Sequence, residues 1–358
     1  METLASRLVP EAVKNLIPYQ SARRIGGQGH IWLNANELEQ GCDYGEGSGA
    51  YHRYPDFLPH QLAERYLAYS LNGREVQDLE ALAVRGADEA IDLLVRTFCQ
   101  PGRDKVLVCP PTYAMYEFCA ESFMVEAVKV PLLDNFQLNV PQICAQLPQA
   151  KLLFLCSPNN PTGNVIRQED IHAILEASQS STLVVVDEAY IEFAPDTTVV
   201  DLIAQYPNLV VIRTLSKAFG LAAVRCGFLL ADPGVMTYVA RLVAPYPIAD
   251  PVAQISLSAL SETGVARMRT QTASLIAVRD WFIDQVQQLP MVETVYPSAT
   301  NFVLIRFRGP ECIYSHLLDR GIVTRNQAHD PALNHCVRIS VGSKNSMLET
   351  LNALKEYN

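Results

Sequence analysis

Leu-Val-Val-Val-Asp-Glu-Ala-Tyr, residues 183–190, is the stretch that decides the fold. An unbroken apolar run followed at once by an acidic residue is typical of a strand that is covered on both faces and ends at the acid. Similar short runs alternate with longer segments of helical period from about residue 80 to residue 235. This alternation predicts an α/β fold with a mainly parallel central sheet, whose strands lie at 105–109, 152–156, 183–187, 209–214 and 226–230.

A chain of 358 residues is long for a single core and predicts a large domain with a smaller companion. Within the large domain, one helix is expected at about 85–98. Beyond Pro245-Tyr246-Pro247 the pattern changes to a helical stretch at about 251–289, a strand at 301–307, a helix at 311–320, a strand at 337–341 and a helix from about 344. We therefore predict a large domain at 45–270 and a discontinuous small α+β domain made of residues 1–44 and 271–358.

Composition and charge exclude several classes of partner. The chain is 49% hydrophobic and 18% charged, with a net charge of −10 and no dense run of lysine and arginine, which argues against nucleic acid. Its apolar runs are much shorter than the roughly 20 residues that span a bilayer. Because the start also lacks the pattern of a secretory signal, we expect a cytoplasmic protein with no membrane partner.

Cysteine and histidine usage predicts neither disulfides nor a metal site. The nine cysteines are an odd number, form no C-x-x-C pair and have mostly apolar neighbours, which favours buried free thiols. The seven histidines show no spacing that is typical of a zinc site.

Polar side chains follow several of the predicted strands, and the carboxyl ends of parallel strands meet at one edge of a sheet. Asp187 ends the strand at 183–187, and Tyr190 comes three residues later. A buried carboxylate is costly unless a cation or donors meet it, although an aspartate here can also simply cap the next turn. Lys217 follows the strand at 209–214, and its apolar and small neighbours let an amine lose its proton at modest cost.

Other residues nearby are candidates for holding an anion or a flat ring. Ser216 and Arg225 flank the lysine, although a lysine and an arginine eight apart are usually solvated surface. The predicted helix opens at Gly86-Ala87-Asp88, which is either an anion site or an ordinary helix start. Asn160 lies in a segment built to turn, so a tight loop is its alternative, and core packing is the alternative for Tyr113 as a stacking ring.

These residue types together predict a site for pyridoxal phosphate (PLP). PLP needs a lysine for its aldehyde, an acid beside the pyridine nitrogen, donors for the ring hydroxyl oxygen and an anion cradle for the phosphate. The candidate lysine is Lys217 and the candidate acid is Asp187. Tyr190 and Asn160 are the candidate donors, and the start of the helix is the candidate anion cradle. A glycine-rich stretch at 41–49 is either a flexible surface loop or a mobile cover for this site.

Several motifs resemble those of a known family. They are R-G-A-D-E (85–89), P-P-T-Y (110–113), S-P-N-N-P-T-G (157–163), D-E-A-Y-I-E-F (187–193), T-L-S-K-A-F-G-L (214–221) and V-R-C-G (224–227). They resemble the fold-type-I PLP-dependent aminotransferases and, within that family, the branch that acts on histidinol phosphate. P-Y-Q (18–20), L-N-A-N-E (33–37), R-Y-P (53–55) and V-R-I-S-V-G (337–342) extend the resemblance almost from end to end.

The resemblance implies a role for each matching position. Lys217 would hold PLP as a Schiff base and move a proton, Asp187 would pair with the pyridine nitrogen, and Tyr190 would contact the ring oxygen, which makes these three the catalytic set. Tyr54 of the partner subunit would reach the phosphate, so the resemblance implies a homodimer with shared active sites. The implied cofactor-binding set is Ala87, Asp88, Tyr113, Asn160, Asp187, Tyr190, Ser216, Lys217, Arg225 and Tyr54.

For the substrates, the resemblance implies that Arg338 binds the carboxylate of glutamate and the phosphate of histidinol phosphate. A structural ion pair is the alternative for Arg338, and Tyr19, Asn36 and Arg325 are further substrate candidates. The implied reaction moves an amino group between glutamate or 2-oxoglutarate and histidinol phosphate or imidazole-acetol phosphate, in histidine biosynthesis.

Two stretches depart from the family pattern, and other activities stay open. Ala223-Val224 stands where the family usually has Gly-Leu, and Thr324 replaces an apolar residue before Arg325. The alternatives are an aromatic amino-acid aminotransferase and a PLP-dependent decarboxylase of a phosphorylated amino acid. A ligand-sensing domain of a transcription regulator needs an attached DNA-binding module, for which the chain has no room.

Overall fold

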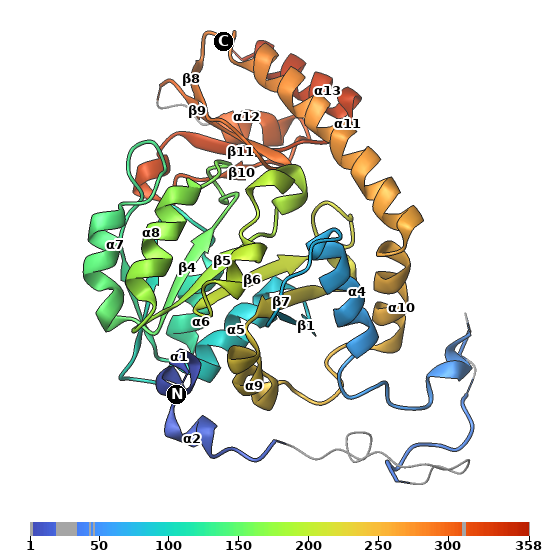
Figure 1. Ribbon diagram of the computed structural model, residues 1–358. Coiled ribbons are helices and arrows are strands. Elements are labelled where there is room, and N and C mark those ends of the chain that lie inside the picture. The colour runs from blue at the N-terminus through green and yellow to red at the C-terminus, as the bar shows by residue number, and fades with distance from the viewer. Residues whose placement is uncertain (1–2, 19–33, 43, 46, 310–312, 358) are drawn as a thin grey trace.

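A computed structural model describes residues 3–18, 34–42, 44–45, 47–309 and 313–357, and its centre is a seven-stranded sheet (Figure 1). The strand order is β1-β7-β6-β5-β4-β2-β3. β2 to β6 run parallel, whereas β7 is antiparallel to both of its neighbours. The strands are β1 (Glu80–Val84), β2 (Lys105–Val108), β3 (Glu126–Lys129), β4 (Leu152–Cys156), β5 (Leu183–Asp187), β6 (Leu209–Thr214) and β7 (Gly227–Ala231).

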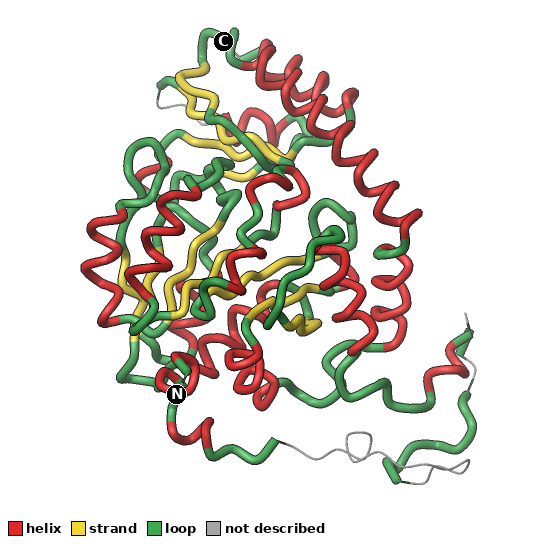
Figure 2. Tube along the Cα trace, in the orientation of Figure 1, coloured by secondary structure: helices red, strands yellow, loops and turns green. Residues whose placement is uncertain are grey.

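Helices cover both faces of this sheet, so that the yellow strands in Figure 2 lie between layers of red helix. Side chains along β4 alternate, with Phe154 packing in one apolar cluster and Leu153 and Leu155 in the other. Every residue of β4, β5 and β6 is buried, which explains their unbroken apolar runs. One face carries α5 (Ala87–Phe98), α6 (Met115–Ser122) and α9 (Pro233–Leu242), and the other carries α4 (His60–Leu71), α7 (Val140–Gln146) and α8 (Gln168–Ser178).

The helical stretch predicted at 251–289 is two helices. α10 (Asp250–Ala259) ends before Ser261, whose hydroxyl accepts a hydrogen bond from the Gly264 amide at 3.1 Å and caps the start of α11 (Glu262–Val286). α11 then runs from the side of the large sheet to the C-terminal part of the molecule (Figure 1). This helix links the two sheets.

A four-stranded antiparallel sheet of order β10-β11-β9-β8 forms the C-terminal part. Phe282 and Val286 of α11 pack in its core together with residues of two further helices. Phe302 and Leu304 also contact residues of the large sheet's loops, Tyr190 and Phe136 respectively. The elements are β8 (Val292–Val295), β9 (Phe302–Phe307), α12 (Ile313–Asp319), β10 (Arg325–Asn326), β11 (Cys336–Ser340) and α13 (Lys344–Lys355).

The described N-terminal residues lie away from the C-terminal sheet, which differs from the prediction that residues 1–44 join it. α1 (Leu4–Leu8) and α2 (Glu11–Lys14) pack against α9, and Ala5 and Leu8 are buried in the core of the large sheet. Arg241 of α9 donates to the carbonyls of Val13 and Lys14 at 3.2 and 2.5 Å. Figure 1 shows the two termini at opposite ends of the molecule. The short apolar stripe of α1 is therefore buried against α9.

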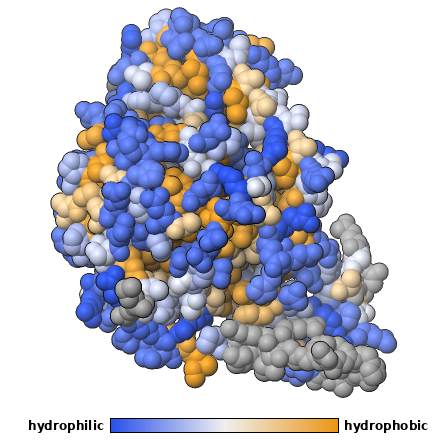
Figure 3. All heavy atoms as spheres, viewed as in Figure 1, coloured by the Kyte–Doolittle hydropathy of each residue, from blue (hydrophilic) through white to orange (hydrophobic). Residues whose placement is uncertain are grey.

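Among the described residues, no helix is both long and apolar enough to cross a membrane. The face of the molecule in Figure 3 is mostly hydrophilic, with separate hydrophobic patches. All eight described cysteines have free thiols, and six of them are buried, in agreement with the prediction of buried free thiols.

Candidate active site

A cavity at the carboxyl ends of the central parallel strands contains every predicted cofactor-binding residue except Tyr54. Ala87 and Asp88 come from the start of α5, Asp187 from the end of β5, and Lys217 from the segment between β6 and β7. Cys156, Ala189, Thr214 and Ala222 also line it, and the sequence did not single these out. The lining residues are Ala87, Asp88, Tyr113, Cys156, Asn160, Asp187, Ala189, Tyr190, Thr214, Ser216, Lys217, Ala222 and Arg225.

Asp187 is a buried carboxylate held by two neutral donors. Its Oδ1 accepts from the backbone N–H of Ala189 at 3.0 Å and its Oδ2 from the hydroxyl of Tyr116 at 2.8 Å. Burial raises the pKa of this carboxyl to about 6, although the two hydrogen bonds lower it. Because Asp187 forms no ion pair with the described residues, a cation in the cavity would offset the cost of burying it.

Lys217 stands in the same cavity on a short turn after β6. The Ser216 amide donates to Thr214 Oγ1 at 3.1 Å, and the Gly220 amide donates to the Lys217 carbonyl at 3.1 Å, which shapes this turn. The Lys217 Nζ lies 5.6 Å from the centre of the Tyr190 ring. Burial, and next the positive charge of Arg338, lower the pKa of the Lys217 amine, so it is more readily neutral than an ordinary lysine.

The start of α5 and Arg225 form an anion cradle. Backbone N–H groups in the first turn of a helix lack intrahelical partners and attract phosphate. The Asp88 carboxylate does not add to this attraction, because it accepts from Tyr113 at 3.0 Å and from Arg225 Nη2 at 3.3 Å. Asp88 would therefore contact a phosphate through its amide and use its side chain to place Tyr113 and Arg225.

Two glycines let the backbone of β7 approach this helix start. A Cβ at Gly227 would lie 2.6 Å from the carbonyl carbon of Gly86, and a Cβ at Gly86 would lie 2.7 Å from Arg225 Nη2. Gly86 also has a φ of 82°, in the region that favours glycine. Larger side chains at either position would push Arg225 away from the helix start.

The structure separates two adjacent asparagines that look alike in the sequence. Asn159 is buried, with its amide donating to the Pro111 carbonyl at 2.9 Å and to Thr162 Oγ1 at 2.6 Å, so it holds the turn. Asn160 instead lines the cavity, and its Oδ1 accepts from Arg338. Asn160 is therefore the one available to a ligand.

Arg338 reaches the site from the C-terminal sheet. It lies on β11 with its guanidinium carbon 5.3 Å from the centre of the Phe302 ring, and burial lowers its pKa. Arg325 is directly opposite it on β10, so the two side chains share one face of the sheet. Since Arg338 forms no ion pair with any described residue, the structural ion pair that the sequence left open has no partner there.

The family model for aminotransferase class I and II matches residues 32–354. The chain belongs to this family. Histidinol-phosphate aminotransferase of Escherichia coli O127:H6 (strain E2348/69 / EPEC) is 44% identical to this aminotransferase over 348 residues, which cover 97% of each chain.

Two solved structures share its fold. Histidinol-phosphate aminotransferase from Sinorhizobium meliloti, in complex with pyridoxal-5'-phosphate, has a TM-score of 0.77 at 26% identity and covers 87% of this aminotransferase and 84% of that chain. L-threonine-O-3-phosphate decarboxylase from Porphyromonas gingivalis has a TM-score of 0.72 at 22% identity, with coverage of 87% and 92%, which is a likeness of fold alone.

Pyridoxal phosphate is the cofactor of this aminotransferase family, and the residues present fit it. The buried Asp187 carboxylate has no cation of its own, the Lys217 amine has a lowered pKa, and an anion cradle lies beside both. A carboxylate, an amine and an anion cradle are three of the four groups that PLP requires of a protein, and Tyr190 and Asn160 in the same cavity can supply the fourth, donors to the ring oxygen.

Four predicted residues that the structure describes, Tyr54, Asn36, Arg325 and Arg338, do not line this cavity in the aminotransferase, although Arg338 contacts the lining residue Asn160. Tyr54 is half exposed and stacks on Tyr246, with ring centres 4.5 Å apart. Asn36 is exposed and has a φ of 57°. Tyr19 lies outside the described residues.

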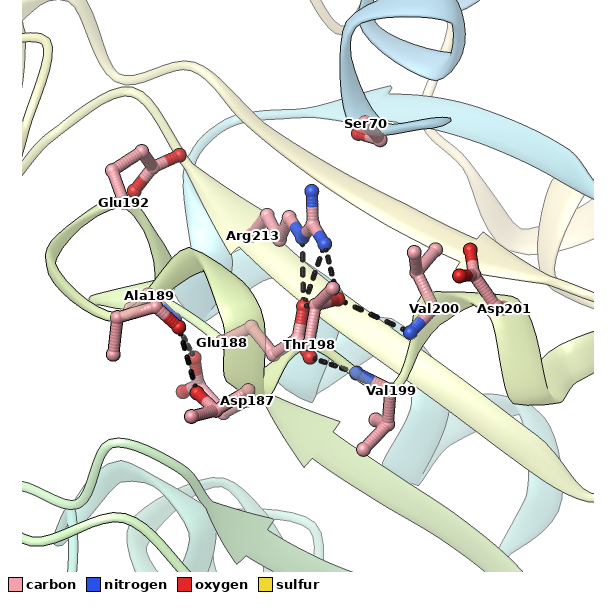
Figure 4. A network of polar contacts seen from close by, with 12 residues as sticks. Ser70, Asp187, Glu188, Ala189, Glu192, Thr198, Val199, Val200, Asp201 and Arg213 are labelled. Carbon is pink, nitrogen blue, oxygen red and sulfur yellow. Dashed lines mark hydrogen bonds and ion pairs between the residues drawn. The ribbon is translucent and has the colours of Figure 1, made fainter. Parts of the chain in front are cut away.

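A buried ion pair beside the cavity fixes the ends of β5 and β6 (Figure 4). Arg213 Nη2 lies 2.8 Å from Glu188 Oε2, and both side chains are almost fully buried. Thr198 donates to the same carboxylate at 3.0 Å, and the Val199 amide donates to Oε1 at 2.7 Å. Because Glu188 follows Asp187 directly, this network helps to hold the backbone that carries Asp187.

A second and larger cavity of about 860 Å³ lies next to that network. Glu192, Arg213 and Ser70 line it, and lysine is not among its lining residues. It shares no residue with the cavity around Lys217. Cavity volume therefore does not select the candidate active site of this aminotransferase, whereas the chemistry of Lys217 and Asp187 does.

Proposed function

We propose that this chain is a histidinol-phosphate aminotransferase, which moves an amino group between glutamate or 2-oxoglutarate and histidinol phosphate or imidazole-acetol phosphate in histidine biosynthesis. The similarity to the Escherichia coli enzyme of that name, over 97% of both chains, supports this assignment. The observation that carries it is the position of Arg338, a cation without a carboxylate partner among the described residues, whose charge reaches Lys217 in the cavity.

The cofactor would be held at both ends. Bound PLP supplies an aldehyde that condenses with amines and a protonated ring that stabilises negative charge on the neighbouring carbon. Asp187 would keep the proton on the ring nitrogen, and Tyr113 would lie against the ring. Tyr190 and Asn160 donate to the ring oxygen. The phosphate is bound by Ala87, Asp88, Ser216 and Arg225.

Lys217 is the proton carrier. Its amine would hold the resting cofactor, and with substrate bound the neutral amine would carry a proton between the substrate Cα and the C4′ carbon of the cofactor. Burial favours this role, because it lowers the pKa of the Lys217 amine toward the working range of a base.

Arg338 is the substrate anchor, and Arg325 lies next to it. A guanidinium binds a carboxylate or a phosphate through two parallel hydrogen bonds, so one residue can receive glutamate in one half-reaction and a phosphorylated amine in the other. Arg325 adds positive charge on the same face of the C-terminal sheet. Tyr19 and Asn36 would complete the pocket from the N-terminal segment.

The test of substrate is a single half-reaction. Purified holoenzyme is mixed separately with histidinol phosphate, tyrosine and phosphothreonine, and the loss of the cofactor's visible absorbance is followed. We expect rapid loss with histidinol phosphate alone. Loss mainly with tyrosine would make the enzyme an aromatic amino-acid aminotransferase, and release of carbon dioxide from phosphothreonine would make it a decarboxylase.

The enzyme would act as a homodimer in which each active site uses Tyr54 of the partner subunit. Tyr54 is 50% exposed and lies outside the cavity of its own chain. Glu37 accepts from the Tyr54 amide at 2.7 Å and from Arg53 at 2.9 Å, so the segment that carries Tyr54 is held in place. Ile17, Leu38 and Tyr44 of the same N-terminal part are 82%, 67% and 89% exposed, as in a surface that a partner covers.

Hybrid dimers test this arrangement. A subunit with Lys217→Ala is combined with one that carries Tyr54→Ala, using different affinity tags to isolate the hybrid. If Tyr54 crosses to the partner, one of the two sites has both residues, and we expect activity well above that of either variant alone. A hybrid no more active than its parents would place Tyr54 in its own subunit's site.

The compartment would be the cytoplasm. Free buried thiols among the described cysteines are typical of proteins from a reducing compartment. Fractionation of cells that express the protein would test this, and recovery with secreted or membrane fractions would contradict it.

A further inference from the structure

Tyr116 is a fully buried tyrosine beneath the cofactor cavity, and the proposed function gives it no role. It lies on α6 with its ring stacked on Phe154, at 5.0 Å between ring centres and an angle of 4°. Tyr113 meets the same ring edge-on at 5.7 Å. Packing on two sides therefore fixes where the hydroxyl of Tyr116 points.

That hydroxyl donates to Oδ2 of Asp187 at 2.8 Å. The other carboxylate oxygen accepts from the Ala189 amide at 3.0 Å, so each oxygen has one protein donor and the plane of the carboxylate is set. A carboxylate oxygen accepts about two hydrogen bonds, so each oxygen of Asp187 has room for one more donor from the cavity. The donor expected there is the ring N–H of the cofactor.

We propose that Tyr116 is a positioning residue, whose hydroxyl orients the Asp187 carboxylate toward the cofactor ring nitrogen and keeps that carboxylate ionised. This rests on the proposed cofactor site. Burial raises the pKa of Tyr116 well above its ordinary value, so the phenol keeps its proton and always acts as the donor. Asp187 itself is held ionised against a burial cost that raises its pKa to about 6, and the Tyr116 hydrogen bond works against that rise.

Among the described groups around Asp187, Tyr116 is the side chain that donates a hydrogen bond to its carboxylate. Lys217 lowers the pKa of Asp187 from across the cavity, whereas the Asp88 carboxylate on α5 raises it. The Cys156 thiol on β4 lies next to both Tyr116 and Asp187, and burial keeps it protonated because its pKa is raised. Tyr113 and Tyr190 also line the cavity as neutral phenols, since burial raises the pKa of each.

The test removes one hydroxyl group. Tyr116→Phe keeps the ring and its stacking and removes only the hydroxyl. Tyr66→Phe is the matched control, because Tyr66 is equally buried and stacks on Phe228 with ring centres 3.6 Å apart, outside the cofactor cavity. In Tyr116→Phe we expect the cofactor to leave the resting enzyme about tenfold faster, the ratio that a hydrogen bond to a charged group is worth.

Two further readouts separate positioning from packing. The pH midpoint of the cofactor's visible band should move upward, since a ring nitrogen that is less fully protonated withdraws less charge from the Lys217 nitrogen. The value of kcat for glutamate should fall while its KM stays near that of the wild type, because the glutamate carboxylate contacts Arg338. Tyr66→Phe should leave all three quantities unchanged.

A double variant separates loss of the hydrogen bond from loss of stability, in case Tyr116→Phe is less stable. In an Asp187→Ala background, which leaves the hydroxyl no acceptor, adding Tyr116→Phe should change the cofactor release rate by less than about twofold. A further tenfold change there would mean that Tyr116 acts through packing, and wild-type release by the single variant would also overturn the proposal. Cofactor release needs no substrate, so this result stands apart from the substrate assignment.

Discussion

Replacement of Lys217 by alanine is expected to abolish amino transfer, with a fall in kcat of at least about 10⁴-fold. In the proposed mechanism Lys217 holds the resting cofactor and carries the proton, and no second lysine lines the cavity among the described residues. The visible band of the cofactor should change as well, because alanine has no amine to join it. The measurement is single-turnover loss of the visible band with glutamate.

Lys151→Ala is the control for Lys217→Ala. Lys151 directly precedes β4, at the amino end of the sheet and so at the edge opposite the cavity. We expect this variant to keep its activity and its absorbance, and the Lys217 variant to keep a folded chain by circular dichroism. Normal turnover by Lys217→Ala would rule out the mechanism.

Replacement of Arg338 by alanine is expected to lower kcat/KM for both glutamate and histidinol phosphate by about 10²- to 10³-fold. Truncating one member of a buried, hydrogen-bonded charge pair costs about 2–5 kcal/mol, because the substrate anion is left without its partner. Arg325 alone should not replace it, since its side chain is exposed. The resting cofactor should stay bound, because Arg338 is not part of the anion cradle or the Asp187 site, while the pH midpoint of its visible band should rise, because the Arg338 charge lowers the pKa of the Lys217 amine.

Arg306→Ala is the matched control for Arg338. Arg306 lies on the neighbouring strand β9, with its guanidinium donating to Tyr296 at 2.9 Å and to the Ala332 carbonyl at 2.8 Å. Arg306→Ala removes the same charge from the same sheet. The hydrogen bonds of Arg306 go to Tyr296 and Ala332, which do not line the cavity, whereas Arg338 bonds to Asn160, which does. An Arg338→Ala enzyme with unchanged KM for glutamate, or an equal loss in both variants, would contradict the role of Arg338 as anchor.

How well the sequence predicts a strand depends on how fully that strand is buried. The strands at 152–156, 183–187 and 209–214 have the predicted bounds, because every residue in them is buried and the sequence must be apolar throughout. β1 and β3 were missed. β3 reads Glu-Ala-Val-Lys and no residue in it is fully buried, so its pattern cannot be told from that of a loop. The antiparallel direction of β7 could not be predicted either, because an apolar run looks the same in a parallel and in an antiparallel buried strand.

The N-terminal segment shows the same limit. Residues 4–8 carry a short apolar stripe that fits several surfaces, and the choice of α9 depends on what that surface offers in three dimensions. Likewise, Tyr116 is only an aromatic residue three positions after Tyr113 in the sequence. Its hydrogen bond to Asp187 joins residues 71 positions apart, so no local sequence pattern predicts this bond.

The sequence by itself determined which chemical groups stand at the ends of the strands. Asp187, Lys217 and the helix start at Gly86 each sit beside a local pattern, an apolar run or a helix signal, that places them at one edge of the sheet. Only the tertiary structure decided that Asn160 and not Asn159 faces the cavity, that Tyr116 supports Asp187, and that Arg338 enters from a second sheet, 178 positions from its partner Asn160. These contacts join residues far apart in the chain, and packing, which no local run of residues encodes, sets which of them meet.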